Sequence, residues 1–218
     1  MDYMEFLRKS IEKNEKEARE MLLKERQNKM AHLTRSSNIP KRYRNATFES
    51  FNPKDNPRAL EIAKKFAMNF PEDKGLLLTG PVGTGKTHLA CAIAKALLNK
   101  LYSVYFGNVV DIMSFIRGTY NRNSSLTEEE AVNIMTKEVD LFIIDDLGKE
   151  NNSEYTLSIL YQLINRVYEN EKPIIITTNF NSIELARKLG ERGQAIVSRI
   201  TEMCEPVIFK GEDWRLKR

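Results

Sequence analysis

The stretch GPVGTGKTHLA, residues 80–90, decides the fold of this chain. It has the form G-x-x-x-x-G-K-[ST], a phosphate-binding loop, because glycine, four residues and then Gly85, Lys86 and Thr87 follow in that order. The glycines can take positive φ, so that the backbone closes on a ligand without a Cβ in the way. Backbone N–H groups at a helix N-terminus then face phosphate oxygens. We expect the nucleotide to be bound by Gly80, Pro81, Val82, Gly83, Thr84, Gly85, Lys86, Thr87 and His88.

The surroundings of this loop support the same interpretation. An apolar stretch over residues 75–80 predicts a buried strand, and apolar residues recur at helical spacing from Leu89 to Leu98. Strand, glycine loop and helix therefore occur in the order that a P-loop requires. We expect Lys86 to reach the β- and γ-phosphates of ATP and the hydroxyl of Thr87 to bind Mg²⁺. For His88 we expect packing or a local hydrogen bond.

Composition favours a soluble protein of the cytoplasm. The 218 residues are 41% hydrophobic and 29% charged, and no apolar run approaches the ~20 residues of a membrane span. The N-terminus is charged from residue 2, which argues against a secretory signal. Cys91 and Cys204 are isolated, which argues for a reducing compartment and against a zinc site.

The N-terminal segment, residues 1–37, differs from the rest. A charged helix is predicted from residue 4 to about residue 30, with a thin apolar stripe formed by Leu7, Ile11, Ala18 and Leu22. Such a helix is stable mainly when it docks on something, so we assign the segment to partner docking. Residues 28–44 then hold five Lys or Arg and no acid. This charge fits nucleic acid or another acidic partner, and equally a solvated linker.

Residues 38–218 form the predicted core. Helices are expected at residues 57–69, 109–120, 127–138 and 153–169, and strands at 75–80, 103–106, 141–144 and 173–178. Thr127 and Glu130 form a capping box at the start of one of these helices. Continuous apolar strands that alternate with helices predict an α/β fold, in which a parallel sheet is covered by helices on both faces.

Polar residues follow two of the predicted strands. In such a sheet the ligand lies beyond the carboxyl ends of the strands. LFIIDDLG, residues 141–148, resembles a Walker B motif: Asp145 would hold Mg²⁺, and Asp146 would orient and polarise the attacking water. Asn179 would bond both the γ-phosphate and that water. Paired acids can also merely terminate a strand, and asparagine is a common turn former.

ATP hydrolysis also needs positive charge at the γ-phosphate, often from an arginine of a neighbouring molecule. Arg192, Arg199 and Arg215 are candidates, and spacing alone does not choose among them. Arg199 is expected to follow the last core helix.

The chain resembles the AAA+ ATPases of the helicase-loader group, the DnaC/DnaI and IstB-like family. The resemblance rests on five stretches in order: GPVGTGKTHLA, IIDDLG, TTN, SRI and WR. The resemblance covers about residues 38–216. It implies an AAA+ P-loop core that binds ATP and Mg²⁺ and hydrolyses ATP slowly, with stimulation by a partner or by DNA. Arg199 would be the arginine finger of an ATP-dependent homo-oligomer, and Arg215 the second sensor acting in cis. It also implies contacts with single-stranded DNA from the insert at 109–138, for which Arg117, Tyr120 and Arg122 are candidates. These residues equally fit the solvated end of a helix.

Three features depart from the wider pattern. Asp146 stands where most AAA+ proteins have glutamate, a feature shared with the loader group. Only 19 residues follow Arg199, which is too few for a C-terminal lid domain. The N-terminal region lacks the cysteines of the zinc module found in some loaders.

The function implied is the delivery of a replicative helicase to single-stranded DNA. The alternative within the family is an IstB-type transposition helper, which acts with a transposase on duplex DNA. A small-molecule P-loop kinase and a nucleotide-dependent switch that barely hydrolyses ATP are further alternatives.

Overall fold

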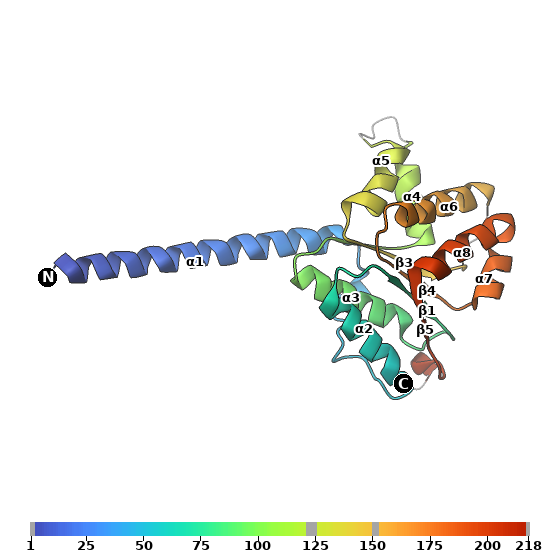
Figure 1. The fold of residues 1–218 in the computed structure, drawn as a ribbon, viewed down its shortest axis with the longest axis horizontal. Helices are drawn as coiled ribbons and strands as arrows, with labels where there is room; N and C mark the ends of the chain where they lie inside the picture. The colour runs from blue at the N-terminus through green and yellow to red at the C-terminus, as the bar shows by residue number, and fades with distance from the viewer. Residues whose placement is uncertain (1–2, 121–125, 150–152, 217–218) are drawn as a thin grey trace.

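A computed structural model describes residues 3–120, 126–149 and 153–216, with side chains described from residue 14 onward. The chain forms a long N-terminal helix, α1 (Tyr3–Ser36), that projects from an α/β body (Figure 1). Within the described ranges, no helix combines the length and the apolar character that crossing a bilayer requires.

The body is built on a sheet of five parallel strands in the order β2-β3-β4-β1-β5. These are β1 (Gly75–Thr79), β2 (Val104–Asn108), β3 (Leu141–Leu147), β4 (Ile174–Thr178) and β5 (Cys204–Ile208). The first four correspond to the predicted strands. β5 has no counterpart among them, and it forms the sheet edge next to β1.

Helices cover both faces of this sheet, as predicted. α2 (Pro57–Asn69) and α3 (Lys86–Asn99) share one apolar cluster with the strands, and α2 begins and ends at the predicted residues. On the opposite face, a second cluster joins the strands to α4 (Val109–Gly118), α5 (Glu128–Asn133), α6 (Glu154–Glu169), α7 (Ser182–Lys188) and α8 (Gly193–Met203). The described residues also form four short turns: η1 (Lys41–Tyr43), η2 (Ile134–Glu138), η3 (Gly190–Arg192) and η4 (Trp214–Leu216).

Two predicted helices differ in extent by five residues or more. The capping box of Thr127 and Glu130 is present at the start of α5. The helix predicted at 127–138 ends at Asn133, however, and the chain continues as the wider π-turn η2. The N-terminal helix extends to Ser36, six residues beyond its predicted end.

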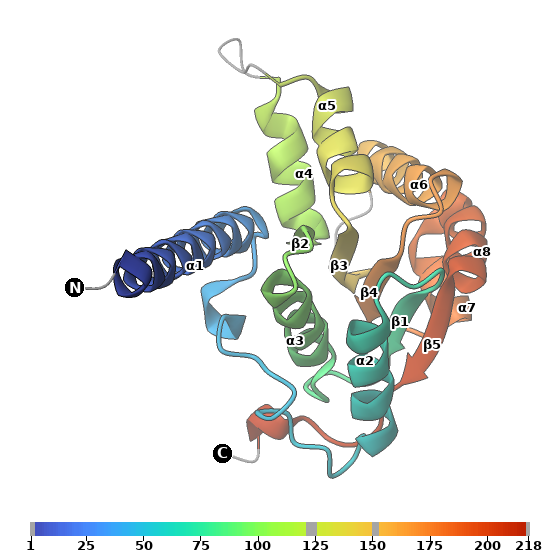
Figure 2. The same ribbon diagram turned by 60° about the vertical axis from the view of Figure 1, so that its left-hand side comes forward.

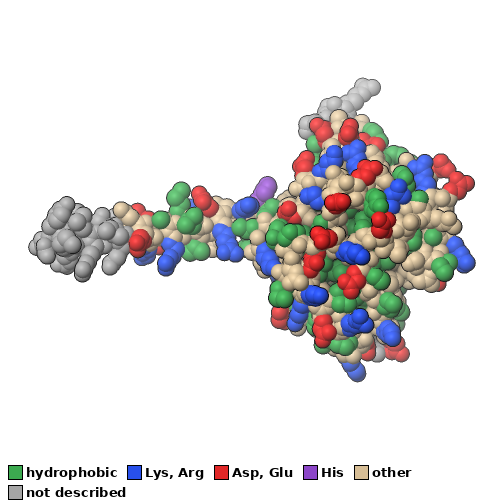
Figure 3. Space-filling view, viewed as in Figure 1, with side chains coloured by type: hydrophobic (Ala, Val, Ile, Leu, Met, Phe, Trp, Pro, Cys, Tyr) green, Lys and Arg blue, Asp and Glu red, His purple; other side chains and the backbone are tan. Residues whose placement is uncertain are grey.

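The end of α1 is fixed to the edge of the sheet. The N–H of Phe106 in β2 donates to the carbonyl of Ser37 (2.8 Å), and the side-chain amide of Asn38 donates to the Phe106 carbonyl (3.2 Å). Ser37 is fully buried, whereas side chains 14–29 of α1 are exposed. α1 is therefore anchored at its C-terminal end and extends away from the body, as Figures 2 and 3 show.

Candidate nucleotide-binding site

A pocket opens at the carboxyl ends of the central strands, between the glycine loop and the residues that follow β3 and β4. Most of the predicted site residues line it, together with three that the sequence did not single out as site residues, Arg42, Tyr43 and Lys149. The lining consists of Arg42, Tyr43, Val82, Gly83, Gly85, Lys86, Thr87, His88, Asp146, Lys149, Asn179 and Arg215.

The glycine loop has the predicted backbone. Gly83 has φ +77° and Gly85 has φ +97°, both in the left-handed region that favours glycine. A Cβ on Gly83 would lie 1.9 Å from Oδ1 of Asp213, and one on Gly85 would lie 2.6 Å from a ring carbon of Phe51. The loop is thus packed between a segment before the core strands and the C-terminal segment, and only glycine fits at these two positions.

Lys86, the first residue of α3, folds back onto the loop. Its Nζ donates to the carbonyls of Gly80 and Pro81, both at 2.7 Å, and the residue is 5% exposed. Burial lowers the pKa of Lys86 to about 8, because it disfavours the charged form. A phosphate placed in the pocket would offer this ammonium an anionic partner in place of two neutral carbonyls.

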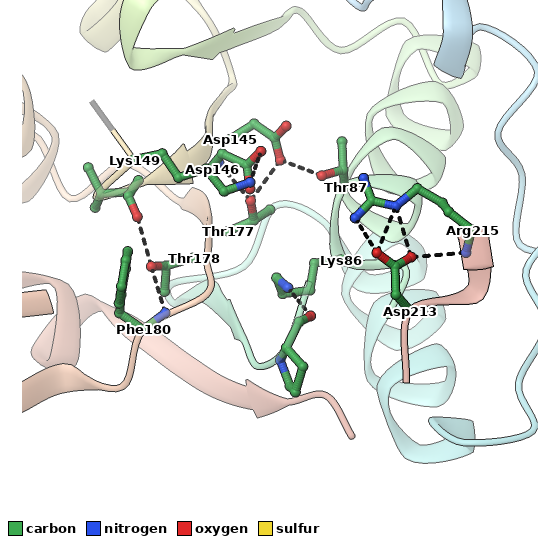
Figure 4. A network of polar contacts seen from close by, with 12 residues as sticks. Lys86, Thr87, Asp145, Asp146, Lys149, Thr177, Thr178, Phe180, Asp213 and Arg215 are labelled. Atoms are coloured by element: carbon green, nitrogen blue, oxygen red, sulfur yellow. Dashed lines mark hydrogen bonds and ion pairs between the residues drawn. The ribbon is translucent and has the colours of Figure 1, made fainter. Parts of the chain in front are cut away.

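Thr87 and Asp145 lie together, which fits the predicted Mg²⁺ site. The Thr87 hydroxyl donates to Oδ1 of Asp145 (2.9 Å), and the hydroxyl of Thr177 in β4 donates to the same oxygen (2.7 Å) (Figure 4). Asp145 is 8% exposed; burial raises its pKa, and the hydrogen bonds from Thr177 and Thr87 oppose that rise. Thr177, which sequence reasoning missed, thereby fixes the carboxylate from behind.

The donor set suits a magnesium ion that is held jointly with a nucleotide. Mg²⁺ prefers oxygen ligands and is usually bound by one or two carboxylates, water and substrate phosphates. Asp145 and Thr87 supply such oxygens next to the loop. Across the described side chains, no group of three or more His, Cys, Asp or Glu converges, so an ion here would take its other ligands from phosphate and water. Bound Mg²⁺ would neutralise charge on the phosphates.

Asp146 is turned into the pocket by an irregularity at the end of β3. The register with β4 shifts between Ile144 and Leu147, and Asp146 has φ +56°, a conformation that aspartate tolerates. Its N–H donates to the Thr177 hydroxyl (2.8 Å), and its carboxylate pairs with Lys149 Nζ (2.8 Å). The two acids therefore face different surroundings: Asp145 is buried, and Asp146 borders the open pocket.

Asn179 and Arg215 both line the pocket. Asn179 directly follows β4. Arg215, in η4, is paired with Asp213 through Nη2–Oδ2 (2.7 Å) and Nε–Oδ1 (2.9 Å), and this pairing holds the pKa of Asp213 at about 2. Arg215 therefore borders the nucleotide pocket, as its predicted role as second sensor requires, and it is paired with Asp213 of the same segment.

Arg199 lies inside α8, so the expectation that it follows the last core helix was wrong. Its Nε donates to Oδ1 of Asn165 (2.9 Å), and its guanidinium lies over the rings of Tyr161 (5.1 Å) and Tyr168 (5.7 Å). Arg199 does not line the pocket of its own chain. The other candidate, Arg192, is exposed in η3.

Two of the predicted DNA-contacting residues, Arg117 and Tyr120, contact other side chains of the same face. Arg117 lies over the ring of Tyr155 (5.8 Å), and the hydroxyl of Tyr120 donates to Glu128 and contacts the Tyr155 hydroxyl (3.0 Å). Tyr120 is nevertheless 60% exposed. Arg122 lies outside the described residues, and their role in DNA binding stays a prediction.

The remaining predicted residues have simple surroundings. His88 Nε2 lies 3.1 Å from the Ser50 hydroxyl and 3.0 Å from the Thr47 carbonyl, which are local hydrogen bonds of the expected kind. In the α1 stripe, Ala18 and Leu22 are exposed, and the side chains of Leu7 and Ile11 lie outside the described part.

The five-stranded parallel sheet carries a P-loop between β1 and α3, paired acids at the end of β3 and a polar residue after β4. This arrangement defines an AAA+ P-loop fold. The crystal structure of the DnaC helicase loader has this fold, with a TM-score of 0.69 and 32% identity over 78% of this chain and 100% of that one. AMPPCP-bound DnaA from Aquifex aeolicus is also similar, with a TM-score of 0.65 and 25% identity over 80% of this chain and 52% of DnaA.

A family model for IstB-like ATP binding proteins matches residues 1–218, and the chain belongs to this family. The replicative helicase loader DnaC of Escherichia coli strain K12 is 34% identical over 174 residues, which are 77% of this chain and 70% of DnaC. The phage-like element PBSX protein XkdC of Bacillus subtilis strain 168 is 29% identical over 206 residues, 86% of this chain and 73% of XkdC. The resemblance inferred from the motifs is confirmed.

Proposed function

We propose that this protein is an ATP-dependent loader that delivers a replicative helicase to single-stranded DNA. The observation that carries the proposal is the 34% identity with the helicase loader DnaC over 174 residues. Both cysteines are buried and free, which fits action in the reducing cytoplasm.

The pocket supports binding of Mg²⁺ and ATP. Backbone N–H groups of residues 82–86 would hold the phosphates, and Lys86 would leave its two carbonyls for the β- and γ-phosphates. Thr87 and Asp145 would hold Mg²⁺ from one side. Asp146 and Asn179 border the open part of the pocket, where an attacking water would be oriented and the γ-phosphate contacted.

The position of Arg199 supports assembly into an oligomer. Its guanidinium lies outside its own pocket, so any contact with ATP would be with that of a neighbouring subunit. Arg215 already borders its own pocket, which supports a role in cis. Arg117 and Tyr120, at the end of α4, provide a cation and an exposed aromatic ring of the kind that binds single strands.

The exposed helix α1 supports docking of a protein partner through residues 1–37, with 38–218 as the ATPase core. Side chains 14–29 are exposed, and they include Met21 and Leu22, each 65% exposed. Apolar side chains on a helix that contacts little of its own body are typical of a partner interface.

The test is a loading assay with the replicative helicase of the source organism and circular single-stranded DNA. We expect the full chain to bring helicase onto the circle only with ATP, and Lys86→Ala to fail. Lys65→Ala, on the exposed surface of α2, is the matched control and should load normally. A chain lacking residues 1–29, which leaves Leu33 on the core cluster, should bind ATP but not capture helicase. Absence of helicase capture by the full chain would contradict the proposal.

The second candidate is a transposition helper, and the family description, IstB-like ATP binding protein, favours it over the remaining alternatives. Stimulation of ATP hydrolysis separates the two. A loader should respond to single-stranded DNA and helicase, whereas a helper should respond to duplex DNA and a transposase.

A further inference from the structure

The pocket is lined by four cationic side chains, and three of them are already engaged. Lys149 pairs with Asp146, Arg215 pairs with Asp213, and Lys86 donates to two backbone carbonyls. The fourth, Arg42, is exposed and lies 6.0 Å from the centre of the Tyr43 ring. Within the described residues no carboxylate lies in ion-pair range of Arg42, so its charge is available to a ligand.

Arg42 and Tyr43 line the same pocket as Lys86, Thr87 and Asp146. Burial raises the pKa of the Tyr43 hydroxyl, and the charges of Asp145 and Asp146 add to the rise, while Arg42 opposes it. Asp146 lies near the end of β3, so the pocket that Arg42 and Tyr43 line extends to the acids of that strand. A triphosphate whose β-phosphate rests on the glycine loop extends its γ-phosphate toward the same acids and Mg²⁺.

The segment that carries Arg42 is held firmly. Ile39 and Tyr43 pack against the apolar cluster of the α2/α3 face, and the Tyr43 N–H donates to the Pro40 carbonyl (2.9 Å). Just before it, Ser37 and Asn38 are bonded to β2. A guanidinium that projects from a fixed backbone loses less freedom when it binds an anion, and its planar fork suits phosphate oxygens.

We propose that Arg42 binds the γ-phosphate of ATP in the pocket of its own subunit. This inference rests on the proposed ATP site, and it adds a phosphate ligand from the segment that joins α1 to the core. Arg42 lies six residues after Ser36, the last residue of α1. Binding of the γ-phosphate would therefore affect the segment that joins α1 to the core.

The test compares the affinities of ATPγS and ADP, each with Mg²⁺, by titration calorimetry on the full chain. Arg42→Ala should weaken ATPγS binding about tenfold or more, because a charge-assisted hydrogen bond is lost, and should change ADP binding less than about twofold. Arg44→Ala is the matched control: Arg44 is exposed two residues away, does not line the pocket, and its backbone carbonyl accepts from Lys95. It should leave both affinities unchanged.

Three results would overturn the assignment while wild-type protein binds ATPγS. The first is that Arg42→Ala binds ATPγS as tightly as wild type does. The second is that a folded Arg42→Ala loses as much affinity for ADP as for ATPγS. The third is that its loss of ATPγS affinity appears only at protein concentrations where subunits assemble. The last would place Arg42 in a neighbour's site. Failure of the wild-type chain to bind either nucleotide would instead contradict the ATP site itself. Unfolding curves of each variant establish that the core is intact.

Discussion

Burial of the P-loop lysine should make the nucleotide-free protein less stable at neutral pH than at alkaline pH. The pKa of Lys86 is about 8 in the fold, against its ordinary value of 10.5. Between these two values the unfolded chain holds a proton that the folded chain has released, so the free energy of unfolding rises with pH in that window. Below pH 8 Lys86 is protonated in both the folded and the unfolded state, so the folded state is destabilised by the whole free energy of burying that charge.

The size of the effect follows from the two pKa values. From about pH 7 to pH 9.5, titration of Lys86 alone should raise the free energy of unfolding by about 2 kcal/mol. The variant Lys86→Met fills a similar volume without a charge, so it should lack this rise. It also leaves the carbonyls of Gly80 and Pro81 without their Nζ donor, and this loss does not depend on pH. The pH dependence of the difference between the two proteins therefore isolates the charge.

The assay is urea unfolding of wild type and Lys86→Met without nucleotide at both pH values. Parallel changes in the two proteins would show that Lys86 titrates normally in the fold and would refute the reasoning. A second readout is nucleotide affinity: binding of ATPγS to wild type should weaken as pH rises through 8, because a neutral Lys86 must first gain a proton.

Three further predictions concern charged residues in the pocket and outside it. Asp146→Asn should keep Mg²⁺-dependent ATP binding but stop hydrolysis, since its shape is retained and its charge is lost; steady-state turnover near the wild-type rate would exclude Asp146 as the water-orienting group. Asp213→Asn should tighten nucleotide binding only a few-fold by releasing Arg215 from an exposed ion pair, measured by calorimetry, and weaker binding would contradict this. Arg199→Ala should bind ATP without hydrolysing it, and mixing it with inactive Lys86→Ala should restore partial activity; no recovery in mixed assemblies confirmed by light scattering would exclude a role in trans.

The sheet could largely be predicted because its central strands are continuous apolar runs. β1, β3 and β4 are buried on both faces, so their sequences carry an unbroken signal. β5 carries no such signal: only Cys204 and Val207 are buried, and Pro206, which lacks an N–H, is tolerated because the strand lies at the sheet edge. β5 therefore forms mainly because it pairs with β1, and its own sequence pattern does not predict a strand.

The site could be predicted where its residues form a local motif. The glycine loop and the paired acids near the end of β3 are each contiguous in the sequence, and the ends of parallel strands meet at one edge of the sheet. Arg42 and Lys149 reach the pocket through the tertiary fold, and no spacing in the sequence links them to Gly85. Arg199 was expected after the last core helix, although Ile196 and Ile200 on either side of it have helical spacing and are buried in α8.

The packing of the glycine loop limits how ATP can act on the rest of the molecule. A ligand shifts a conformational equilibrium only through contacts that differ between the two states. The elements that touch the loop from outside the sheet are the segment around Phe51, which meets Gly85, and the C-terminal segment, whose Trp214 N–H donates to the Gly83 carbonyl (3.2 Å). Arg215 extends from the second segment, while Arg42 extends from the same N-terminal stretch as Phe51 and lies closer to α1. The central strands are close-packed on both faces and have little room to move. We therefore expect ATP to influence α1 through residues 37–51 rather than through the sheet.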